Sequence, residues 1–447
     1  MKNNKQYDFT QGSIAKQLFY FSGPILLANL LQTSYQFIDS LWVGNLLGSS
    51  ALGAVAISGS ILFVVLSFII GMNNAALTIL SQQKGKQNEK GLRNYLNTFV
   101  VLLTLISIFL GVIGYIFAEQ FLGLLGTPQT MMEDASTYLR INFMGIWFLF
   151  GYNFISTVLR SLGDSKTPLY FITIAVGLNI LLDPLFISVF NWGIEGAAYA
   201  TLLSQAFSFL CGISYVLWKK LAPFSLPALP AREEIKLILH LGIPSGLQMA
   251  VISAGSAAIM SVVTTHGESV IAGFGAAQRL DSLLMLPAHA LSTSVASMAG
   301  QNIGIKNWER IRQIAIYGVI YNFAIMLIIG IAVAVFAQYG VRLFIRESDA
   351  VDFGTVYLQI VALCYPFLGI NFILNGIVRA AGAMYQVLIL NVISFWILRY
   401  PLTALFSSWF GEVGIAIGMG GSFVLSSLFA IFYYRYGKWR QKELFAN

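Results

Sequence analysis

Residues 138–163 read YLRINFMGIWFLFGYNFISTVLRSLG, and residues 357–382 read YLQIVALCYPFLGINFILNGIVRAAG. Each stretch is longer than the roughly 20 mostly apolar residues that a helix needs to cross about 30 Å of hydrocarbon. Tyrosine, leucine, isoleucine, phenylalanine, arginine and the final glycine recur at the same places, 219 residues apart. The two stretches therefore predict membrane-spanning helices in a duplicated chain.

Other landmarks repeat with almost the same spacing. Pro24 corresponds to Pro244, and the basic QQKGKQNEKGLR at 82–93 corresponds to QNIGIKNWERIR at 301–312. Between the repeats, the segment KKLAPFSLPALPAREE is rich in proline and charge, as linkers often are. The sequence therefore predicts an N-terminal lobe at 1–218, a cytoplasmic linker at 219–236 and a C-terminal lobe at 237–447.

Composition indicates that most of the chain lies in a membrane. Of its 447 residues, 57% are hydrophobic and 10% are charged, whereas about a quarter of the residues of a soluble domain are charged. Barrel strands would alternate in polarity and be about half as long as these runs, so the prediction is an all-α polytopic membrane protein. Its twelve expected transmembrane helices are 15–42, 52–80, 95–118, 137–160, 169–190, 195–218, 237–265, 271–299, 314–337, 355–379, 386–408 and 414–434.

The number and charge of the loops predict how the chain is oriented. Six helices per lobe is an even number, so both lobes start on the same side and are expected to be related by a pseudo-two-fold axis along the membrane normal. With both termini in the cytoplasm, 21 of the 26 lysines and arginines face the cytoplasm, which is the positive-inside signature. We expect a cell (plasma or inner) membrane protein whose basic surface meets lipid headgroups, with no nucleic-acid partner.

Two aspartates in apolar spans are the first candidates for a functional site. A charge at the centre of a spanning helix costs about 2.5–3.5 kcal/mol, so such residues are functional by default. Protonating an ordinary aspartate at pH 7, about three units above its pKa, costs roughly 4 kcal/mol. Because these costs are similar, Asp39 and Asp183 are expected to bind and release protons. The position of Asp39 in the other lobe holds Ile259 or Met260, so the site is expected in one lobe only.

Each aspartate has a polar neighbour one helical turn earlier. Tyr35 precedes Asp39 and Asn179 precedes Asp183 by four residues, which places each pair on one face of its helix. Pro24 removes a backbone hydrogen bond from the first span and offers a place to bend, although a static kink is the plain alternative.

Several of these stretches together resemble a known family. The segments SYQFIDSLWVGNLLGSSALGA, QQKGKQNEKG, VLRSLGDSKTP with its echo IVRAAGAMYQ, and GLNILLDPLFI are similar to those of the multidrug and toxic compound extrusion (MATE) family. The resemblance covers essentially the whole chain and is greatest for the DinF-like branch, whose marker is an aspartate in span one facing another in span five. It implies a secondary active transporter that exports bulky cationic or aromatic compounds by alternating access, driven by inward proton flow.

The resemblance also implies a set of cation-coupling residues. In this sequence they are Asp39, Tyr35, Asn179 and Asp183, with Asn153 in the fourth span and Thr201 in the sixth, and Pro24 as the bending proline. Sodium is the alternative coupling ion, because carboxylate, amide and hydroxyl oxygens suit hard cations. It would bind at Asp39, Asn179, Asp183 and Thr201.

The C-terminal lobe carries fewer signs of ion coupling. Its seventh and tenth spans offer Gln248, Asn371 and Asn375 where the NorM-like branch of the family has acids, so that kind of sodium site is not expected. Asp281 also lies in a span of this lobe, where pairing with a loop or another span is the structural alternative to lining the cavity. Arg399 in the eleventh span is costly to bury and is expected to need a carboxylate, carbonyls or water as its partner.

Other functions remain open from the sequence. A lipid-linked oligosaccharide flippase of the same superfamily would share the architecture but is expected to need a more cationic cavity. An intramembrane aspartyl protease also uses two membrane aspartates, but its YD and GxGD patterns do not match Asp39 and Asp183. No HExxH, GxSxG or Walker A motif is present. We therefore expect a monomer without enzymatic activity and without a cofactor, which binds lipid and small cationic or aromatic drugs.

Overall fold

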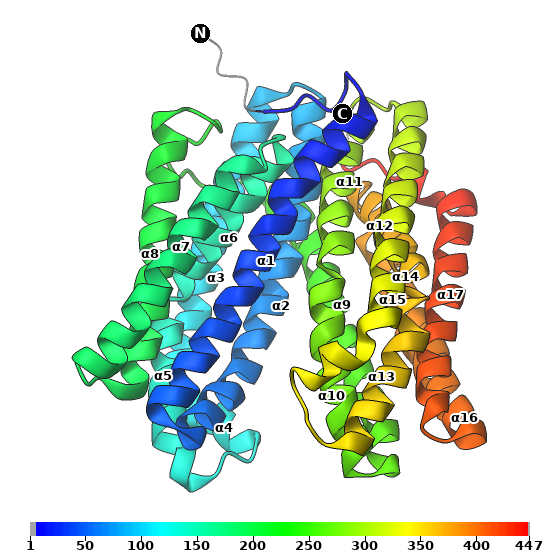
Figure 1. The fold of residues 1–447 in the computed structure, drawn as a ribbon. Coiled ribbons are helices and arrows are strands. Elements are labelled where there is room, and N and C mark those ends of the chain that lie inside the picture. Colours follow the sequence, from blue (N-terminus) through cyan, green and yellow to red (C-terminus); the bar gives the residue numbers. More distant parts are fainter. Residues whose placement is uncertain (1–5, 446–447) are drawn as a thin grey trace. The chain divides into compact units, whose positions relative to one another are not determined.

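The computed structural model describes residues 6–445, which form helices joined by turns and by the longer segment 219–231 and contain no strand (Figure 1). The first half contains α1 Ile14–Leu47, α2 Ser49–Gly85, α3 Glu89–Ile116, α4 Ala118–Leu124, α5 Gln129–Met144, α6 Ile146–Ser161, α7 Lys166–Pro184, the π-helix η1 Leu185–Val189 and α8 Gly193–Trp218. The second half contains α9 Arg232–Val263, η2 Thr264–His266, α10 Glu268–Leu284, α11 Leu286–Gly304, α12 Trp308–Arg342, α13 Ser348–Ala362, α14 Tyr365–Ala380, α15 Met384–Val392, the π-helix η3 Ile393–Arg399, α16 Tyr400–Phe410, α17 Val413–Tyr436 and η4 Lys438–Gln441. The predicted all-α fold is therefore confirmed.

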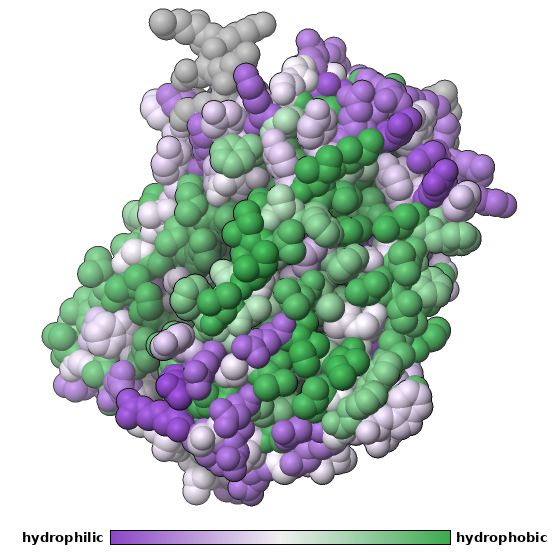
Figure 2. All heavy atoms as spheres, turned by 45° about the vertical axis from the view of Figure 1, so that its right-hand side comes forward, coloured by the Kyte–Doolittle hydropathy of each residue, from purple (hydrophilic) through white to green (hydrophobic). Residues whose placement is uncertain are grey.

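The described helices are long and apolar enough to span a membrane. Ten qualify as single spans, and twelve do so if each of two bent helix pairs counts as one span. Figure 2 shows a broad belt of hydrophobic side chains, with hydrophilic ones gathered towards the upper and lower ends. Large apolar side chains such as Phe109, Ile328 and Phe432 are exposed within these helices. Their exposure is explained by lipid, which replaces water as the solvent there.

Two of the expected spans are broken. The span expected at 137–160 consists of α5 and α6, bent by 50°, and the span at 355–379 consists of α13 and α14, bent by 54°. The first break lies at Gly145, where an added Cβ would come within 2.8 Å of Leu202 Cγ. The second is followed by Pro366 at the start of α14, where proline cannot donate to the preceding turn. The two breaks occupy equivalent places in the two repeats.

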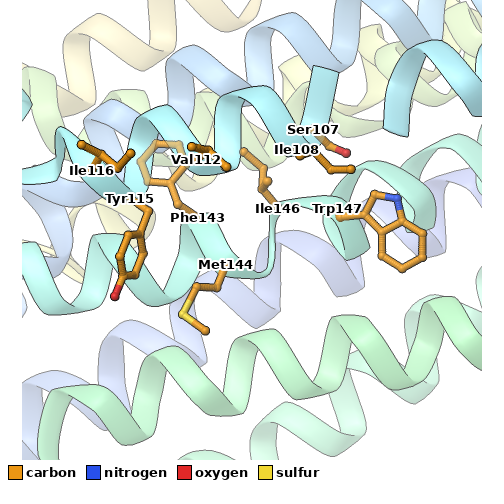
Figure 3. A pocket seen from close by; sticks show the side chains of 10 residues that line it. Ser107, Ile108, Val112, Tyr115, Ile116, Phe143, Met144, Ile146 and Trp147 are labelled. Carbon is orange, nitrogen blue, oxygen red and sulfur yellow. The ribbon is translucent and has the colours of Figure 1, made fainter. Parts of the chain in front are cut away.

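The bend between α5 and α6 forms one wall of an open pocket of about 470 Å³ (Figure 3). The other wall is α3, which contributes Ile108, Val112 and Tyr115, and the bend contributes Met144 and Trp147. These five side chains are exposed. The pocket contains none of the predicted coupling residues.

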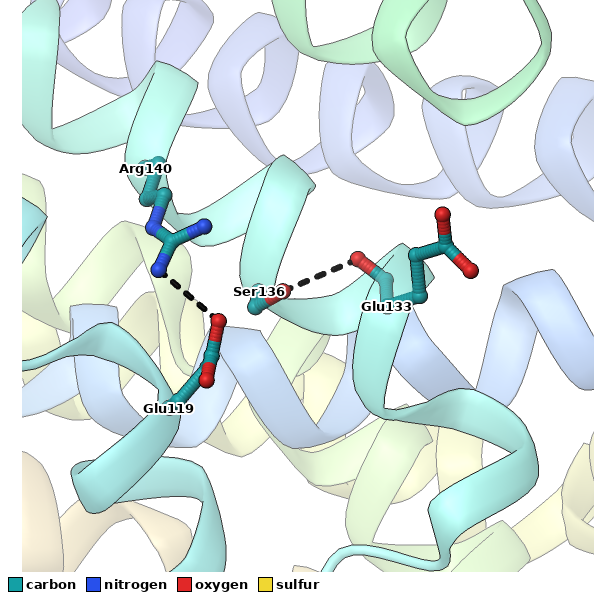
Figure 4. A network of polar contacts seen from close by, with 4 residues as sticks. All are labelled: Glu119, Glu133, Ser136 and Arg140. Atoms are coloured by element: carbon teal, nitrogen blue, oxygen red, sulfur yellow. Dashed lines mark hydrogen bonds and ion pairs between the residues drawn. The ribbon is translucent and has the colours of Figure 1, made fainter.

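The basic residue of α5 has an acidic partner. Arg140 Nη2 lies 2.8 Å from Oε1 of Glu119 on α4, and nearby Ser136 donates to the backbone carbonyl of Glu133 (Figure 4). The charge of Arg140 is therefore balanced locally.

The described chain divides into two compact units. Unit 1 consists of residues 6–8 and Gly23–Gly242, and unit 2 consists of Phe9–Ser22 and residues 243–445. The first turns of α1 therefore pack within unit 2, and the first turns of α9 pack within unit 1. Pro24 and Pro244 lie inside these two helices, within two residues of the points where each helix changes unit.

The turn before α7 is fixed by buried polar contacts, and α7 carries Asn179 and Asp183. Asp164 is buried, and its Oδ1 accepts hydrogen bonds from the backbone N–H groups of Lys166 and Thr167 at 3.1 and 3.0 Å. These bonds satisfy donors that the first turn of a helix leaves free. The adjacent Gly163 has a φ of +90° and packs against the backbone of Tyr7.

Gly163→Ala should destabilise the protein more than a glycine replacement that introduces only backbone strain. A Cβ at Gly163 would lie 2.2 Å from the carbonyl oxygen of Tyr7, whereas one at Gly126, with φ +71°, would meet nothing within 4 Å. We expect Gly126→Ala to cost about 1–2 kcal/mol and Gly163→Ala clearly more. Thermal unfolding of the purified variants in detergent measures both, and equal losses would contradict the close packing at Gly163.

Candidate functional site

The two predicted aspartates lie deep in unit 1. Asp39 is 8% exposed and lies about 38 Å along α1 from Ile14, and Asp183 is fully buried about 26 Å along α7 from Lys166. The two carboxyl groups interact directly with each other. Two carboxylates that share a site cannot both carry a full charge without repulsion, so the pair favours a bound proton or another cation between them.

Polar groups from α7 and α8 complete the predicted cluster. Nδ2 of Asn179, itself fully buried, donates to Oδ1 of Asp183 at 3.1 Å and lies 3.5 Å from Oγ1 of Thr201. The hydroxyl of Tyr35 on α1 interacts with Thr201. The structure therefore brings five of the predicted coupling residues together from three helices.

Several buried oxygens of the cluster have no hydrogen-bond donor within the described chain. They are Oδ1 of Asp39, Oδ1 of Asn179 and Oδ2 of Asp183. A buried acceptor without a partner costs about 1–3 kcal/mol, and more if it is charged. Three such oxygens in one cluster suit a cationic occupant, and they fit either protons or a hard metal ion bound by carboxylate and amide oxygens.

Asn153 is the predicted residue that the structure does not join to this cluster. Its Nδ2 donates to the backbone carbonyl of Leu149 on the same helix, at 2.8 Å. Among residues 6–445 no contact links Asn153 to either aspartate. Its coupling role stays a prediction from the resemblance alone.

Tyr138 is a member of the cluster that sequence reasoning missed. It is buried on α5, and its side chain interacts electrostatically with Asp39 and Asp183. Tyr138 is the first residue of the repeated stretch 138–163 and recurs as Tyr357. This recurrence was the one feature of the sequence that drew attention to it. The recurrence could not indicate a functional role, because tyrosines of helix repeats are more often packing residues.

A small cavity adjoins Tyr35 within unit 1. Its volume is about 40 Å³, and its polar lining includes Gln32, Tyr152, Ser204 and Gln205. A water molecule needs at least about 10–15 Å³ and two to four polar partners. The cavity therefore has both the room and the polar groups to hydrate the edge of the cluster.

Unit 2 has no acid in the place of Asp39. Ile259, the equivalent residue, is 1% exposed and belongs to a hydrophobic core. Gln248 donates to the carbonyl of Met384, and Asn375 donates to Asn371. Neither contact involves a carboxylate, and the sequence has no acid at Gln248, Asn371 or Asn375.

The charged residues of the C-terminal spans have partners in unit 2. Asp281 accepts a hydrogen bond from the hydroxyl of Tyr365. The guanidinium of Arg399 lies 3.9 Å from the ring centre of Phe395 and 4.6 Å from that of Phe423, and its Nε donates to Ser422 Oγ at 3.2 Å. The structural alternative for Asp281 therefore has direct support. The partners of Arg399 are aromatic rings and a hydroxyl, where a carboxylate, carbonyls or water were expected.

The bond from Asn179 to Asp183 can be tested by a double-mutant cycle. We expect Asn179→Ala and Asp183→Ala to be non-additive by about 1–3 kcal/mol, because each single variant already loses the shared bond. As a control, Ser208 donates to Phe171 O at 2.7 Å and lies about 10 Å along α8 from Thr201. Ser208→Ala should be additive with Asn179→Ala. Chemical unfolding in detergent gives the free energies, and additivity of the first pair would contradict the contact.

Comparison with known proteins gives the family. The MatE family model matches residues 24–185 and 244–405, two ranges that begin at Pro24 and Pro244, so the predicted duplication is confirmed. The chain is 62% identical over 443 residues to the probable multidrug resistance protein YpnP of Bacillus subtilis (strain 168), covering 99% of this chain and 100% of the relative. It is 30% identical to the probable multidrug resistance protein YoeA of the same strain, covering 97% and 96%.

Solved structures agree on the fold. A crystal structure of a variant of the Vibrio cholerae MATE transporter VcmN superposes with a TM-score of 0.91 at 23% identity, covering 96% of this chain and 98% of the other. Together with the apolar spans, the family and its relatives show that the protein is an integral membrane protein. The chain belongs to the MatE family, the multidrug and toxic compound extrusion transporters.

Proposed function

We propose that the protein is a cation-coupled multidrug antiporter of the DinF-like branch, which exports bulky cationic or aromatic compounds as protons flow inward. The observation that carries the proposal is the buried carboxyl pair of Asp39 and Asp183. One oxygen of each carboxyl group, and Oδ1 of Asn179 beside them, has no hydrogen-bond donor among residues 6–445. The names of the relatives support multidrug efflux as the outcome of transport.

In the proposed cycle the pair alternates between a protonated and a charged state. Protons enter from outside and neutralise Asp39 and Asp183, which removes the attraction for a bound organic cation. Asn179 donates to Asp183 in either state and fixes its orientation. Pro24 lies inside α1, and in the proposed cycle the charge lost at Asp39 lets α1 bend at this proline. Substrate leaves on the outer side, and the protons are released to the cytoplasm when the site reopens inward.

The membrane potential supplies enough energy for useful export. One elementary charge that crosses 100 mV contributes about 2.3 kcal/mol. Because about 1.4 kcal/mol corresponds to a factor of ten, one proton supports roughly forty-fold accumulation of a neutral compound. We expect the transporter to work in the cell membrane with both termini in the cytoplasm, as a monomer without a cofactor or enzymatic activity.

Sodium is the alternative coupling ion, and one observation supports this alternative. Oxygens of Asp39, Asn179 and Asp183 without donors, together with the hydroxyl of Thr201, offer a hard cation several ligands. In that version sodium occupies the place of the protons and the rest of the cycle is unchanged.

Transport in liposomes tests the role of the pair. Purified protein is reconstituted, and efflux of a fluorescent lipophilic cation is measured under a pH gradient and, separately, under a sodium gradient. We expect Asp39→Asn and Asp183→Asn to lower pH-driven efflux at least tenfold, because a permanently neutral amide cannot release a proton. Asp352→Asn removes an exposed acid and serves as the control that retains wild-type efflux.

Each other outcome selects a different account. Efflux that responds only to the sodium gradient would make the same oxygens a sodium site. Wild-type efflux by Asp39→Asn under the same pH gradient would refute the coupling role of Asp39. If neither gradient drives efflux of any lipophilic cation, the flippase alternative is preferred, and transport of a lipid-linked oligosaccharide is measured instead.

A further inference from the structure

Unit 2 contains a groove that the transport cycle does not use. It lies between α12, α14 and α17 and has a volume of about 840 Å³. Its floor consists of Ala315, Ile370 and Leu374, which are buried and apolar. The groove therefore presents hydrocarbon surface rather than a polar path.

The sides of the groove are open to the membrane. Ile316 and Ile320 on α12 and Ile431 on α17 line it and are all exposed. These residues lie in spans, so the medium they meet is lipid rather than water. The apolar wall runs about 12 Å along α12 from Arg312 to Ile320, which is long enough to receive part of an acyl chain.

Three arginines stand at one end of the same groove. Arg312 comes from the first turns of α12, Arg435 from the last turn of α17, and Arg440 from η4. Arg312 lies 3.9 Å from Glu309, with both side chains about two-thirds exposed, a geometry in which an ion pair is worth little. Within residues 6–445, Arg435 and Arg440 form no ion pair. The groove thus joins an apolar channel to three positive charges with little compensation.

The arginine on η4 is held in place by aromatic packing. Trp439 is 1% exposed, stacks on Tyr434 at 5.2 Å between ring centres and donates from Nε1 to the carbonyl of Tyr434 at 2.8 Å. The guanidinium of Arg440 lies 5.2 Å from the ring centre of Trp439 and 5.6 Å from that of Tyr434. η4 is therefore anchored, and the position of Arg440 at the groove is defined before any ligand binds.

We propose that this groove binds an anionic phospholipid, with its phosphate at Arg312, Arg435 and Arg440 and an acyl chain along α12. Guanidinium groups bind phosphate oxygens through charge-assisted, often bidentate hydrogen bonds. Basic pockets between the ends of spanning helices are suited to acidic lipid headgroups. The lipid is favoured over a free phosphate because the exposed isoleucines and the buried floor would otherwise have no role in recognition.

Lipid titration of the purified protein tests the proposal. Binding of dioleoylphosphatidylglycerol and of dioleoylphosphatidylcholine is measured by native mass spectrometry, with glycerol phosphate as a headgroup without chains. We expect the wild type to bind the anionic lipid at least tenfold more tightly than the zwitterionic one. This preference should be lost in the triple variant Arg312→Gln, Arg435→Gln, Arg440→Gln. Ile320→Gln should weaken binding of the lipid by reducing the apolar surface that contacts the acyl chain.

A matched control separates the groove from net charge. Lys90→Gln, Arg93→Gln, Lys236→Gln removes three exposed positive charges from unit 1 and should retain the lipid preference. Thermal unfolding without added lipid verifies that each variant folds. The proposal is overturned if the wild type has no preference between the two lipids, if the control loses the preference as the groove variant does, or if glycerol phosphate binds as tightly as the intact lipid.

Discussion

The proposed function depends on one interaction, that between two carboxyl groups placed where water is scarce. Asp39 and Asp183 are buried together on α1 and α7, and the cost of an isolated charge there is several kcal/mol. The surroundings lower this cost in part, because Asn179 donates to Asp183, Thr201 of α8 lies beside Asn179, and Tyr35 of α1 interacts with Thr201. The oxygens that have no donor among residues 6–445 suit a cationic occupant, as the proposed coupling requires.

The same fold is used twice, but this chemistry occurs once. The matched ranges start at Pro24 and Pro244, and the bends in α5–α6 and α13–α14 fall at equivalent positions. Duplication therefore accounts for the architecture of both units. Where unit 1 has Asp39, unit 2 has Ile259 in a hydrophobic core. The proposed coupling lies in this departure from the repeat, and a second acid pair would add a second desolvation cost.

Apolar length and the internal repeat predicted the helices and their order, because both depend on local properties of the chain. The bends were missed: Gly145 is one of 41 glycines, and its close approach to Leu202 exists only in the folded chain. The sequence spacing of four residues placed Asn179 beside Asp183 correctly. The family resemblance named Asn153 as a coupling residue. Its amide instead donates within its own helix, an orientation that depends on packing. Long-range packing also assigns the first turns of α1 and α9 to the opposite unit, which no local pattern can indicate.

The central claim is that protons on Asp39 and Asp183 exchange with a cationic substrate, and the most direct measurement counts those protons. Tetraphenylphosphonium is added to purified protein in weakly buffered detergent solution, and the protons released are followed with a pH indicator. The account predicts release of protons by the wild type as the cation binds, and none by the double variant Asp39→Asn, Asp183→Asn. Equal proton release by the wild type and the double variant would contradict it.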